Sequence, residues 1–499
     1  MKYLATLLIS TFVSCTLTKN NNKVNDVKLE ALTDSVAEIY ASSILKKDLY
    51  KDLSVLASDE YEGRETARSG QKKAAKYIVK RFKEIGVNPG AKNGSFLQTF
   101  AVDAKNAANV FITLNGRKWM LLKHFYYKGN IKDTSLLDKQ LVFVGFGIEE
   151  DVYSDYSNIN VKNKVIVINE GVPSSTNLEK NWDSWRKKAD LAKEKGAIGI
   201  ITIDKDFAEE SQRIGFIIEN PNMQMHNPGN RKADLMPNIY ISDSVAKTFL
   251  SKISESTISI EVDIQEELTS DNVLGYIEGT DLKEELVVIT AHYDHLGYDN
   301  GEVCNGADDD GSGTVSVIEL AEAFQKAKND GNGPRRSILF MTVSGEEKGL
   351  WGSKYYTDNP VYSMEKTVVD LNIDMIGRRD DEHDDDNYIY LIGADRISMD
   401  LHVISEKINK KYINYDIDYT YNKRTDPNQF YYRSDHYNFA KNGVPVIFYF
   451  SGVHKDYHKP TDDVDKINFN KVQRTTKMVF FTAWEIANRD QRLRMNGID

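Results

Sequence analysis

The sequence predicts an α/β fold with a mostly parallel central sheet, and two features of its second half carry this prediction. From about residue 272 onward, short and almost continuous apolar runs recur, as in strands whose two faces are both covered. Between the first two of these runs lies a segment with apolar residues at helical spacing. Strands that alternate with helices favour an α/β fold in which most strands run parallel.

Four apolar runs predict the central strands: 286–290, 337–343, 367–373 and 444–450. A helix is predicted over 312–328, because its apolar residues recur every three or so positions: Val315, Ile318, Ala321 and Phe324. A second amphipathic helix is predicted over 71–85, where apolar residues follow the same spacing: Ala75, Ile78, Val79, Phe82 and Ile85. These helices are expected to cover the sheet.

The pattern of apolar and polar residues over 124–265 differs from that of the flanking segments. This difference predicts an inserted domain. They contain β-rich runs, such as 141–147, and a helix near 182–195. They hold few histidines and no cluster with the spacing of metal ligands, so we expect an accessory or substrate-gating module. The catalytic domain is then formed by residues 31–123 together with 266–499.

The start of the chain predicts export and a lipid anchor. The apolar run 3–13 is too short to span a bilayer, so residues 1–14 are expected to form a signal peptide. The Ser14–Cys15 junction resembles that of a lipoprotein signal, after which Cys15 would carry acyl chains and the polar residues 15–30 would form a tether. We therefore expect localisation in the bacterial cell envelope, in the outer membrane or facing the periplasm. An ordinary signal peptide cut nearby is the alternative.

The composition excludes a general nucleic-acid binder. The chain has 75 Asp and Glu against 64 Lys and Arg, a formal net charge of -11, whereas nucleic-acid binding needs a basic face. Its two cysteines are Cys15 and Cys304, so lipidation of Cys15 leaves no partner for an intrachain disulfide. The fold is then expected to depend on core packing and metal.

Side chains that bind metals follow each predicted central strand. His292 comes just after the first run, Glu346 and Glu347 follow the second, Asp374 closes the third, and His458 lies eight residues after the fourth. In open α/β sheets, ligands bind at the carboxyl ends of the strands, so we expect these side chains to lie together. The loop before the predicted helix 312–328 adds three successive aspartates, 308–310.

Imidazole and carboxylate ligands suit zinc, and carboxylates gathered in a cleft would repel each other without cations. Of two adjacent glutamates, one can bind a metal while the other takes a proton from a bound water. The pattern therefore predicts a metal centre that hydrolyses amide bonds.

These motifs resemble the co-catalytic di-zinc aminopeptidases of peptidase clan MH, including bacterial leucyl aminopeptidases. Residues 56–65, with the sequence LASDEYEGRE, resemble the family's entry segment, and residues 124–265 resemble its protease-associated domain in position and texture. The resemblance covers nearly the whole exported chain. It implies a zinc-peptidase sandwich fold, two Zn²⁺ ions and peptide substrates with a free N-terminus.

The resemblance assigns five metal ligands in this sequence. His292 and Asp374 match the ligands of one zinc ion, and Glu347 and His458 match those of the other. Asp309 matches the ligand that bridges both ions, and the resemblance implies that the peptide bond after it is cis.

The resemblance also assigns residues that act beside the metals. Glu346 matches the general base, and Asp294 matches the carboxylate that orients the imidazole of His292. Tyr431 matches the tyrosine that stabilises the oxyanion, with Tyr432 as a rival one residue away. Two further histidines are left without a metal, His295 and His454.

Other functions remain open on the same scaffold. A carboxypeptidase or a glutaminyl cyclase would share most of the ligands, and a non-catalytic binding protein could keep the fold. The complete ligand set together with Glu346 argues against the binding protein, since a receptor has no use for a proton acceptor there. We expect hydrolysis of N-terminal residues, no nucleic-acid partner, and membrane contact only through the anchor at Cys15.

Overall fold

The structure is a computed structural model that describes these residues: 28–30, 35–104, 108–128, 134–174, 178, 181–219, 223–226, 236–264 and 268–497. The expected signal peptide and Cys15 lie outside the described residues, as does most of the expected tether. Among the described helices, none combines the length and apolar character needed to cross a membrane. The chain divides into two units, one formed by residues 1–100 with 270–499 and the other by residues 101–269.

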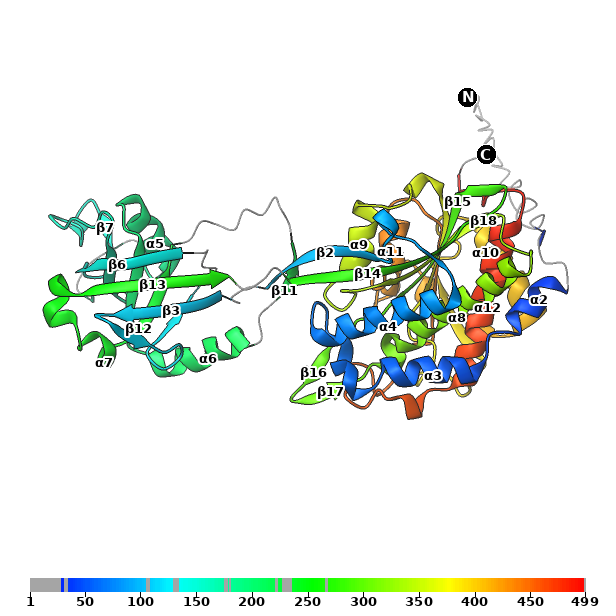
Figure 1. Ribbon diagram of the computed structural model, residues 1–499, viewed down its shortest axis with the longest axis horizontal. Coiled ribbons are helices and arrows are strands. Elements are labelled where there is room, and N and C mark those ends of the chain that lie inside the picture. The colour runs from blue at the N-terminus through cyan, green and yellow to red at the C-terminus, as the bar shows by residue number, and fades with distance from the viewer. Residues whose placement is uncertain are drawn as a thin grey trace, which may run out of the picture. The chain divides into compact units, whose positions relative to one another are not determined.

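The first unit is built on a mixed β-sheet (Figure 1). Its four central strands are parallel neighbours in the order β18 (Arg336–Val343), β15 (Leu282–His292), β19 (Thr367–Ile373) and β22 (Val446–Phe450). Two strands flank them in the antiparallel sense, β14 (Leu268–Ile277) beside β18 and β20 (Tyr388–Ile392) beside β22. The expectation of a mostly parallel sheet is therefore corrected to a mixed sheet. An apolar run indicates that a strand is buried on both faces, but it does not indicate the direction of the strand.

Both faces of this sheet are covered by helices, and alternate residues of β15 face opposite layers. Val287 and Ile289 belong to one apolar core, whereas Leu286 and Val288 belong to the other. The first core includes residues of α2 (Val36–Ala41), α3 (Lys46–Leu56), α4 (Ser69–Ile85), α8 (Gly313–Asn329), α10 (Met399–Ile408) and α12 (Phe469–Asn488). The second includes residues of α9 (Trp351–Asp358) and α11 (His436–Ala440). The two predicted helices are confirmed as α4 and α8.

Smaller strands complete the first unit: β1 (Asn88–Pro89), β16 (Gly297–Asp299), β17 (Glu302–Cys304) and β21 (Asp416–Asp418). β16 and β17 form a hairpin directly after the segment that carries His292. The chain crosses between the two units within β2 (Leu97–Ala104) and within β14.

The second unit contains an eight-stranded sheet in the order β4–β3–β13–β6–β9–β10–β12–β5. The bounds are β3 (Ala108–Leu114), β4 (Arg117–Trp119), β5 (Phe125–Tyr127), β6 (Thr134–Phe143), β9 (Val165–Asn169), β10 (Gly199–Asp204), β12 (Asn238–Ser242) and β13 (Thr257–Ile264). The strands β6, β9, β10 and β12 are parallel, and the remaining pairs are antiparallel. The other elements are β7 (Glu149–Glu150), β8 (Tyr153–Ser154), β11 (Met223–Met225), α5 (Trp185–Glu194), α6 (Phe207–Glu219) and α7 (Asp243–Ala246).

The boundary expected at residue 124 lies too late in the sequence. β3 and β4 come before that residue, yet β3 pairs with both β4 and β13, and the unit extends from residue 101 to 269. Strand pairing joins residues that are far apart in the chain, so the local texture of residues 108–119 does not indicate which sheet they enter.

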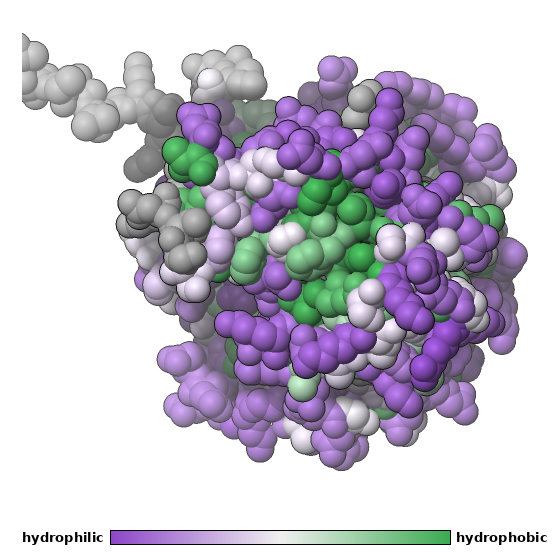
Figure 2. Space-filling view, turned by 90° about the vertical axis from the view of Figure 1, so that its left-hand side faces the viewer, coloured by the Kyte–Doolittle hydropathy of each residue, from purple (hydrophilic) through white to green (hydrophobic). Residues whose placement is uncertain are grey.

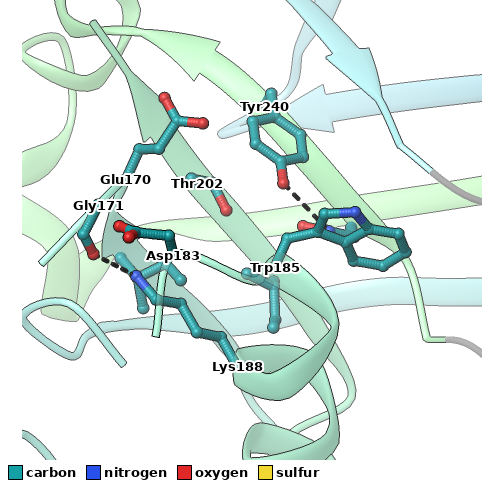
Figure 3. A pocket seen from close by; sticks show the side chains of 10 residues that line it. Glu170, Gly171, Asp183, Trp185, Lys188, Thr202 and Tyr240 are labelled. Atoms are coloured by element: carbon teal, nitrogen blue, oxygen red, sulfur yellow. Dashed lines mark hydrogen bonds between the residues drawn. The ribbon is translucent and has the colours of Figure 1, made fainter. Parts of the chain in front are cut away.

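A small polar cavity lies within the second unit, between the sheet and the first turn of α5 (Figure 3). Trp185 and Lys188 reach it from α5, and Thr202 and Tyr240 reach it from neighbouring strands in register. Burial lowers the pKa of Lys188 to about 8, and burial together with Asp204 raises the pKa of Glu170, also in the lining, to about 7. Among the described residues of this unit, no group of metal-binding side chains is found.

Apolar side chains gather on the face that Figure 2 shows, within a mostly hydrophilic surface. In the second unit, three of the most exposed large apolar side chains are Phe111, Met120 and Leu137, with 61%, 57% and 57% exposure. This unit therefore exposes apolar surface in addition to its buried core.

Candidate metal centre

The five predicted metal ligands meet at one edge of the sheet of the first unit. His292 ends β15, Glu347 and Asp374 follow β18 and β19, and His458 lies in the loop after β22. Because these four strands are parallel neighbours, their carboxyl ends lie together. Asp309 reaches the same place from the loop before α8.

Asp309 lies between two histidine–carboxylate pairs. Its Oδ1 is 3.2 Å from Nε2 of His292, which is itself 3.7 Å from Oδ1 of Asp374. Its Oδ2 is 3.1 Å from Nε2 of His458, which is itself 3.2 Å from Oε2 of Glu347. Each oxygen of Asp309 thus faces a different pair, as a carboxylate that bridges two metal ions would.

His295 belongs to the second of these groups. Its Nδ1 lies 2.8 Å from Oε1 of Glu347 and 3.8 Å from Oδ2 of Asp309, and its side chain is fully buried. The side chains that could hold metal ions therefore form two sets, His292 with Asp309 and Asp374, and His295 with Asp309 and Glu347. The expectation that His295 has no place in the metal centre is corrected. The available signal was its position three residues after His292, in the segment that follows the same strand.

Four buried atoms of the second set have no hydrogen-bond partner among the described residues. One is Nε2 of His295, and the other three lie close together: Nδ1 of His295, Oδ2 of Asp309 and Oε1 of Glu347. A buried polar atom without a partner costs about 1–3 kcal/mol. A cation bound among the last three atoms would satisfy all three, and imidazole with carboxylate is a donor set that suits zinc. The residues present therefore fit a metal ion.

Asp462 holds the backbone of the loop that carries Asp309. The carboxylate of Asp462 accepts hydrogen bonds from the backbone N–H groups of Asp308 (3.0 Å) and Asp309 (3.2 Å). Gly306 enters the loop at a φ of +51°, and a Cβ there would lie 2.5 Å from Cγ of His295. The peptide bond between Asp309 and Asp310 is cis, as the resemblance implies.

Glu346 lies beside the two metal sets without belonging to either. Its Oε2 is 4.0 Å from Nε2 of His292, and its backbone N–H donates to Oδ1 of Asp294 (3.3 Å). The hydroxyl of Thr66 donates to the other oxygen of Asp294 (2.6 Å). The imidazole Nδ1 of His292 is 3.1 Å from the backbone oxygen of Asp294 but 3.8 Å from its carboxylate. Asp294 therefore contacts His292 through its main chain, and its carboxylate accepts the backbone N–H of Glu346 while lying close to the same imidazole.

His292 and His458 have raised pKa values, which favours their protonated, positively charged forms beside the carboxylates of the centre. Burial disfavours charged His292, yet the surrounding carboxylates outweigh burial and hold its pKa well above the usual value. For His458, burial is again outweighed, by Asp309 and Glu347, and the pKa rises to about 10. Burial raises the pKa of Glu346 well above its usual value. A metal ion that binds here must displace the imidazole protons.

A small cavity lies over the carboxylates. Three acidic side chains line one part of it, Asp309, Glu346 and Asp374. The other lining residues are Met375, Phe430, Arg433, Phe448, Phe450, Val453 and Tyr457. A cavity in which carboxylates lie beside aromatic and aliphatic side chains is typical of a substrate site.

Residues 272–483, which carry all five predicted ligands, match the family described as Peptidase family M28. Residues 272–483 are called the M28 segment below.

Relatives of the M28 segment are named as aminopeptidases. Aminopeptidase YwaD of Bacillus subtilis (strain 168) is 24% identical over 251 residues, which cover 49% of this chain and 50% of the relative. A probable leucine aminopeptidase of Arthroderma otae is 29% identical over 212 residues, covering 41% of this chain and 55% of the relative. The chain thus spans about half the length of these curated relatives. Among solved structures, a zinc aminopeptidase from Bacillus subtilis is 19% identical, with 90% of this chain and 96% of that chain covered and a TM-score of 0.48.

In the M28 segment, the tyrosine that lines the cavity is Tyr457. It stacks on His458 with ring centres 3.8 Å apart, and burial together with the nearby carboxylates raises its pKa. Tyr431 instead belongs to the apolar core, where the guanidinium of Arg396 lies 3.8 Å from its ring centre, and Tyr432 is exposed. The structure therefore does not bring Tyr431 into the cavity. The signal that could have found Tyr457 was its position next to His458.

Arg64 is a residue of this site that the sequence interpretation did not single out. Its fully buried guanidinium donates to the backbone oxygens of Leu56 (2.8 Å), Tyr293 (2.8 Å), Asn305 (2.6 Å) and Gly306 (2.8 Å). The segment that carries Arg64 is thereby tied to the end of β15 and to the loop that precedes Asp309. Five guanidinium donors in a fixed plane allow one side chain to hold all these carbonyl groups.

The remaining predicted histidine, His454, lies outside both metal sets. Its Nε2 is 3.2 Å from Oδ2 of Asp308, whose other oxygen accepts the backbone N–H of Gly377 (2.5 Å). His454 therefore lies beside the aspartate loop, next to Asp308.

Proposed function

We propose that this chain is a zinc-dependent aminopeptidase that holds two zinc ions and removes N-terminal residues from peptides. The observation that carries the proposal is the division of Asp309 between two histidine–carboxylate pairs, with Glu346 beside them. The names of the M28 relatives support the same activity. His292 and Asp374 would hold one ion, and Glu347 and His458 the other, with Asp309 bound to both.

Bound zinc would supply Lewis acidity, which lowers the pKa of water and polarises the carbonyl group of the substrate. Glu346 would accept a proton from the attacking water and deliver it to the leaving amine. Its raised pKa in this buried position suits a group that must both take and return a proton. The hydroxyl of Tyr457 reaches the cavity and donates to the negative charge that develops on the substrate oxygen. The free amino group of the peptide binds among the carboxylates at the same end of the cavity.

The test combines one substitution with a panel of substrates. Glu346→Gln should keep a normal zinc content and lose about 10²–10⁴-fold in kcat, the usual contribution of a general base. Glu347→Gln is the matched control, because it should lower zinc affinity and regain part of its activity when zinc is added. Metal analysis and turnover measured on the same preparations separate these outcomes.

The panel consists of short peptides with free and with acetylated N-termini. An aminopeptidase cleaves only the free forms, whereas a carboxypeptidase is indifferent to acetylation and a glutaminyl cyclase acts only on N-terminal Gln. A zinc-loaded wild type that hydrolyses no peptide of a broad free-amine set would overturn the proposal in favour of a non-catalytic binding protein.

The proposal extends to the rest of the chain. Export and acyl chains on Cys15 would place the enzyme in the cell envelope, because multiple acyl chains give stable membrane attachment. Equal soluble fractions of wild type and Cys15→Ser would contradict this anchor.

Residues 101–269 would correspond to the protease-associated domain of the family and act as an accessory module. Deletion of those residues tests this role, since an accessory module can be removed without loss of zinc binding.

A further inference from the structure

We propose that Arg433 binds a carboxylate of the substrate, so that the enzyme favours peptides with an anionic group close to the scissile bond. The inference rests on the proposed function, because it names the substrate class of the same site. The chemistry is that of a guanidinium with a carboxylate, whether the carboxylate belongs to an N-terminal acidic side chain or to the C-terminus of a dipeptide.

The first observation is the position of Arg433 on the wall of the cavity. It lines the same cavity as Glu346 and Asp374. Its guanidinium carbon lies 4.7 Å from the ring centre of Phe430, which packs against Phe450 with ring centres 5.0 Å apart. A guanidinium that rests on an aromatic ring loses little further freedom when it binds a carboxylate. The packing of Arg433 against Phe430 therefore restricts the guanidinium before a ligand binds.

The second observation is that Arg433 is exposed and that its side chain packs against Phe430, with no ion pair or side-chain hydrogen bond found within the part of the chain that the structure describes. Two other arginines of the same unit are engaged. Arg378 pairs with Asp456 at 2.8 Å, and Arg396 donates to the backbone oxygen of Asn422 at 2.7 Å. The planar fork of Arg433 thus keeps its donors available for a bidentate partner.

The lining of the cavity combines groups of both charges with apolar side chains. Its acidic part suits the ammonium group of a peptide, and the apolar side chains Met375, Phe448 and Val453 suit aliphatic carbons. Arg433 is the only basic residue among those that line the cavity, so it is the partner for an anion there. A purely aromatic pocket would favour an apolar side chain at this position, whereas the arginine favours a carboxylate.

Two pairs of substrates separate the two sources of carboxylate. Glu and Gln 4-nitroanilides differ only in the side-chain charge, and Leu-Gly and Leu-Gly-amide differ only in the C-terminal charge. In the zinc-loaded wild type, the anionic member of at least one pair should have the higher kcat/KM, by about 10- to 100-fold for a hydrogen-bonded charge pair. The pair that shows the preference identifies the source of the carboxylate.

Arg433→Gln should remove this preference through a rise in KM for the anionic member, and leave the neutral member within about twofold. Arg433→Lys should keep part of the preference, because it retains the charge without the planar fork. Wild-type zinc content and thermal unfolding temperature in both variants would show that only the binding of the anion has changed.

Equal kcat/KM within both pairs in the wild type would overturn the assignment, as would an equal loss for charged and neutral members in Arg433→Gln. If no substrate is hydrolysed, a binding measurement still tests the role of Arg433. Calorimetric titration of the zinc-loaded protein with glutamate and with glutamine compares the same two charges without turnover. Tighter binding of glutamate that is lost in Arg433→Gln would support Arg433 even where the aminopeptidase assignment fails, and the absence of any difference would refute it.

Discussion

Replacing His295 with leucine is expected to weaken the binding of one metal ion and to leave the other in place. Nδ1 of His295 lies 2.8 Å from Oε1 of Glu347, in the set that includes Asp309. The other set, formed by His292 and Asp374 with Asp309, does not contain His295. The substitution therefore acts on one side of the bridging aspartate.

The magnitude follows from the role of the imidazole. If His295 only orients Glu347, its loss should weaken the second ion about 10- to 100-fold, the usual cost of removing a group that orients a metal ligand. That range corresponds to about 1.4–2.8 kcal/mol, at 1.4 kcal/mol for each factor of ten. A loss larger than this range would identify His295 as a direct ligand. Because the imidazole is fully buried, leucine was chosen to keep the space filled.

The assay is a zinc titration of metal-free protein in competition with a chromophoric chelator, which yields the number of ions and both affinities. His383→Leu is a matched control, since His383 also lies between two carboxylates, Asp380 at 2.9 Å and Asp418 at 3.5 Å, but outside both metal sets. Thermal unfolding of the metal-free variants reports any loss of fold. The reasoning is refuted if folded His295→Leu binds two zinc ions with wild-type affinities.

Three further predictions concern the same centre. Asp309→Asn should weaken both ions, whereas Asp374→Asn should weaken only the ion shared with His292, and equilibrium dialysis that finds equal losses in the two variants would contradict the bridge. Metal affinity should rise with pH from about 6 to 9, because the raised pKa of His458, about 10, means that its proton must leave before the nitrogen can coordinate. Calorimetry in buffers of different ionisation enthalpy should record this proton release, and its absence would place His458 outside the coordination sphere. Arg64→Met should lower the stability of the metal-free protein by about 3–5 kcal/mol, as expected when buried partners of a charged group are left unpaired, and an unchanged denaturation midpoint would show that its four carbonyl groups find other partners.

The resemblance located the five assigned ligands through motifs at strand ends, and the structure brings those five side chains together. The reason is that each ligand is linked by short chain distances to a strand whose apolar run is evident locally, and parallel strands align their carboxyl ends. The roles of Glu346 and Glu347 could also be predicted from the sequence, because one of two adjacent carboxylates can bind a metal while the other remains free.

Two residues that line the cavity, Tyr457 and Arg433, were not predicted from the sequence. Tyr457 takes the position in the cavity that was expected of Tyr431, and the difference depends on whether each ring points to the core or to the cavity. Arg433 lies two residues after Tyr431 and was not singled out, because a sequence does not indicate whether an arginine is paired.

The sequence by itself determined which segments form buried strands and helices and which types of side chain stand at their ends, because apolar periodicity and composition act over a few neighbouring residues. Only the tertiary structure decided that β14 and β20 flank the parallel strands in the antiparallel sense, and that the second unit begins at residue 101. It also decided that His295 joins the metal centre and that Arg64 ties its loops together. These features depend on contacts between residues far apart in the chain, whose geometry is set by the packing of the whole unit and not by any local pattern.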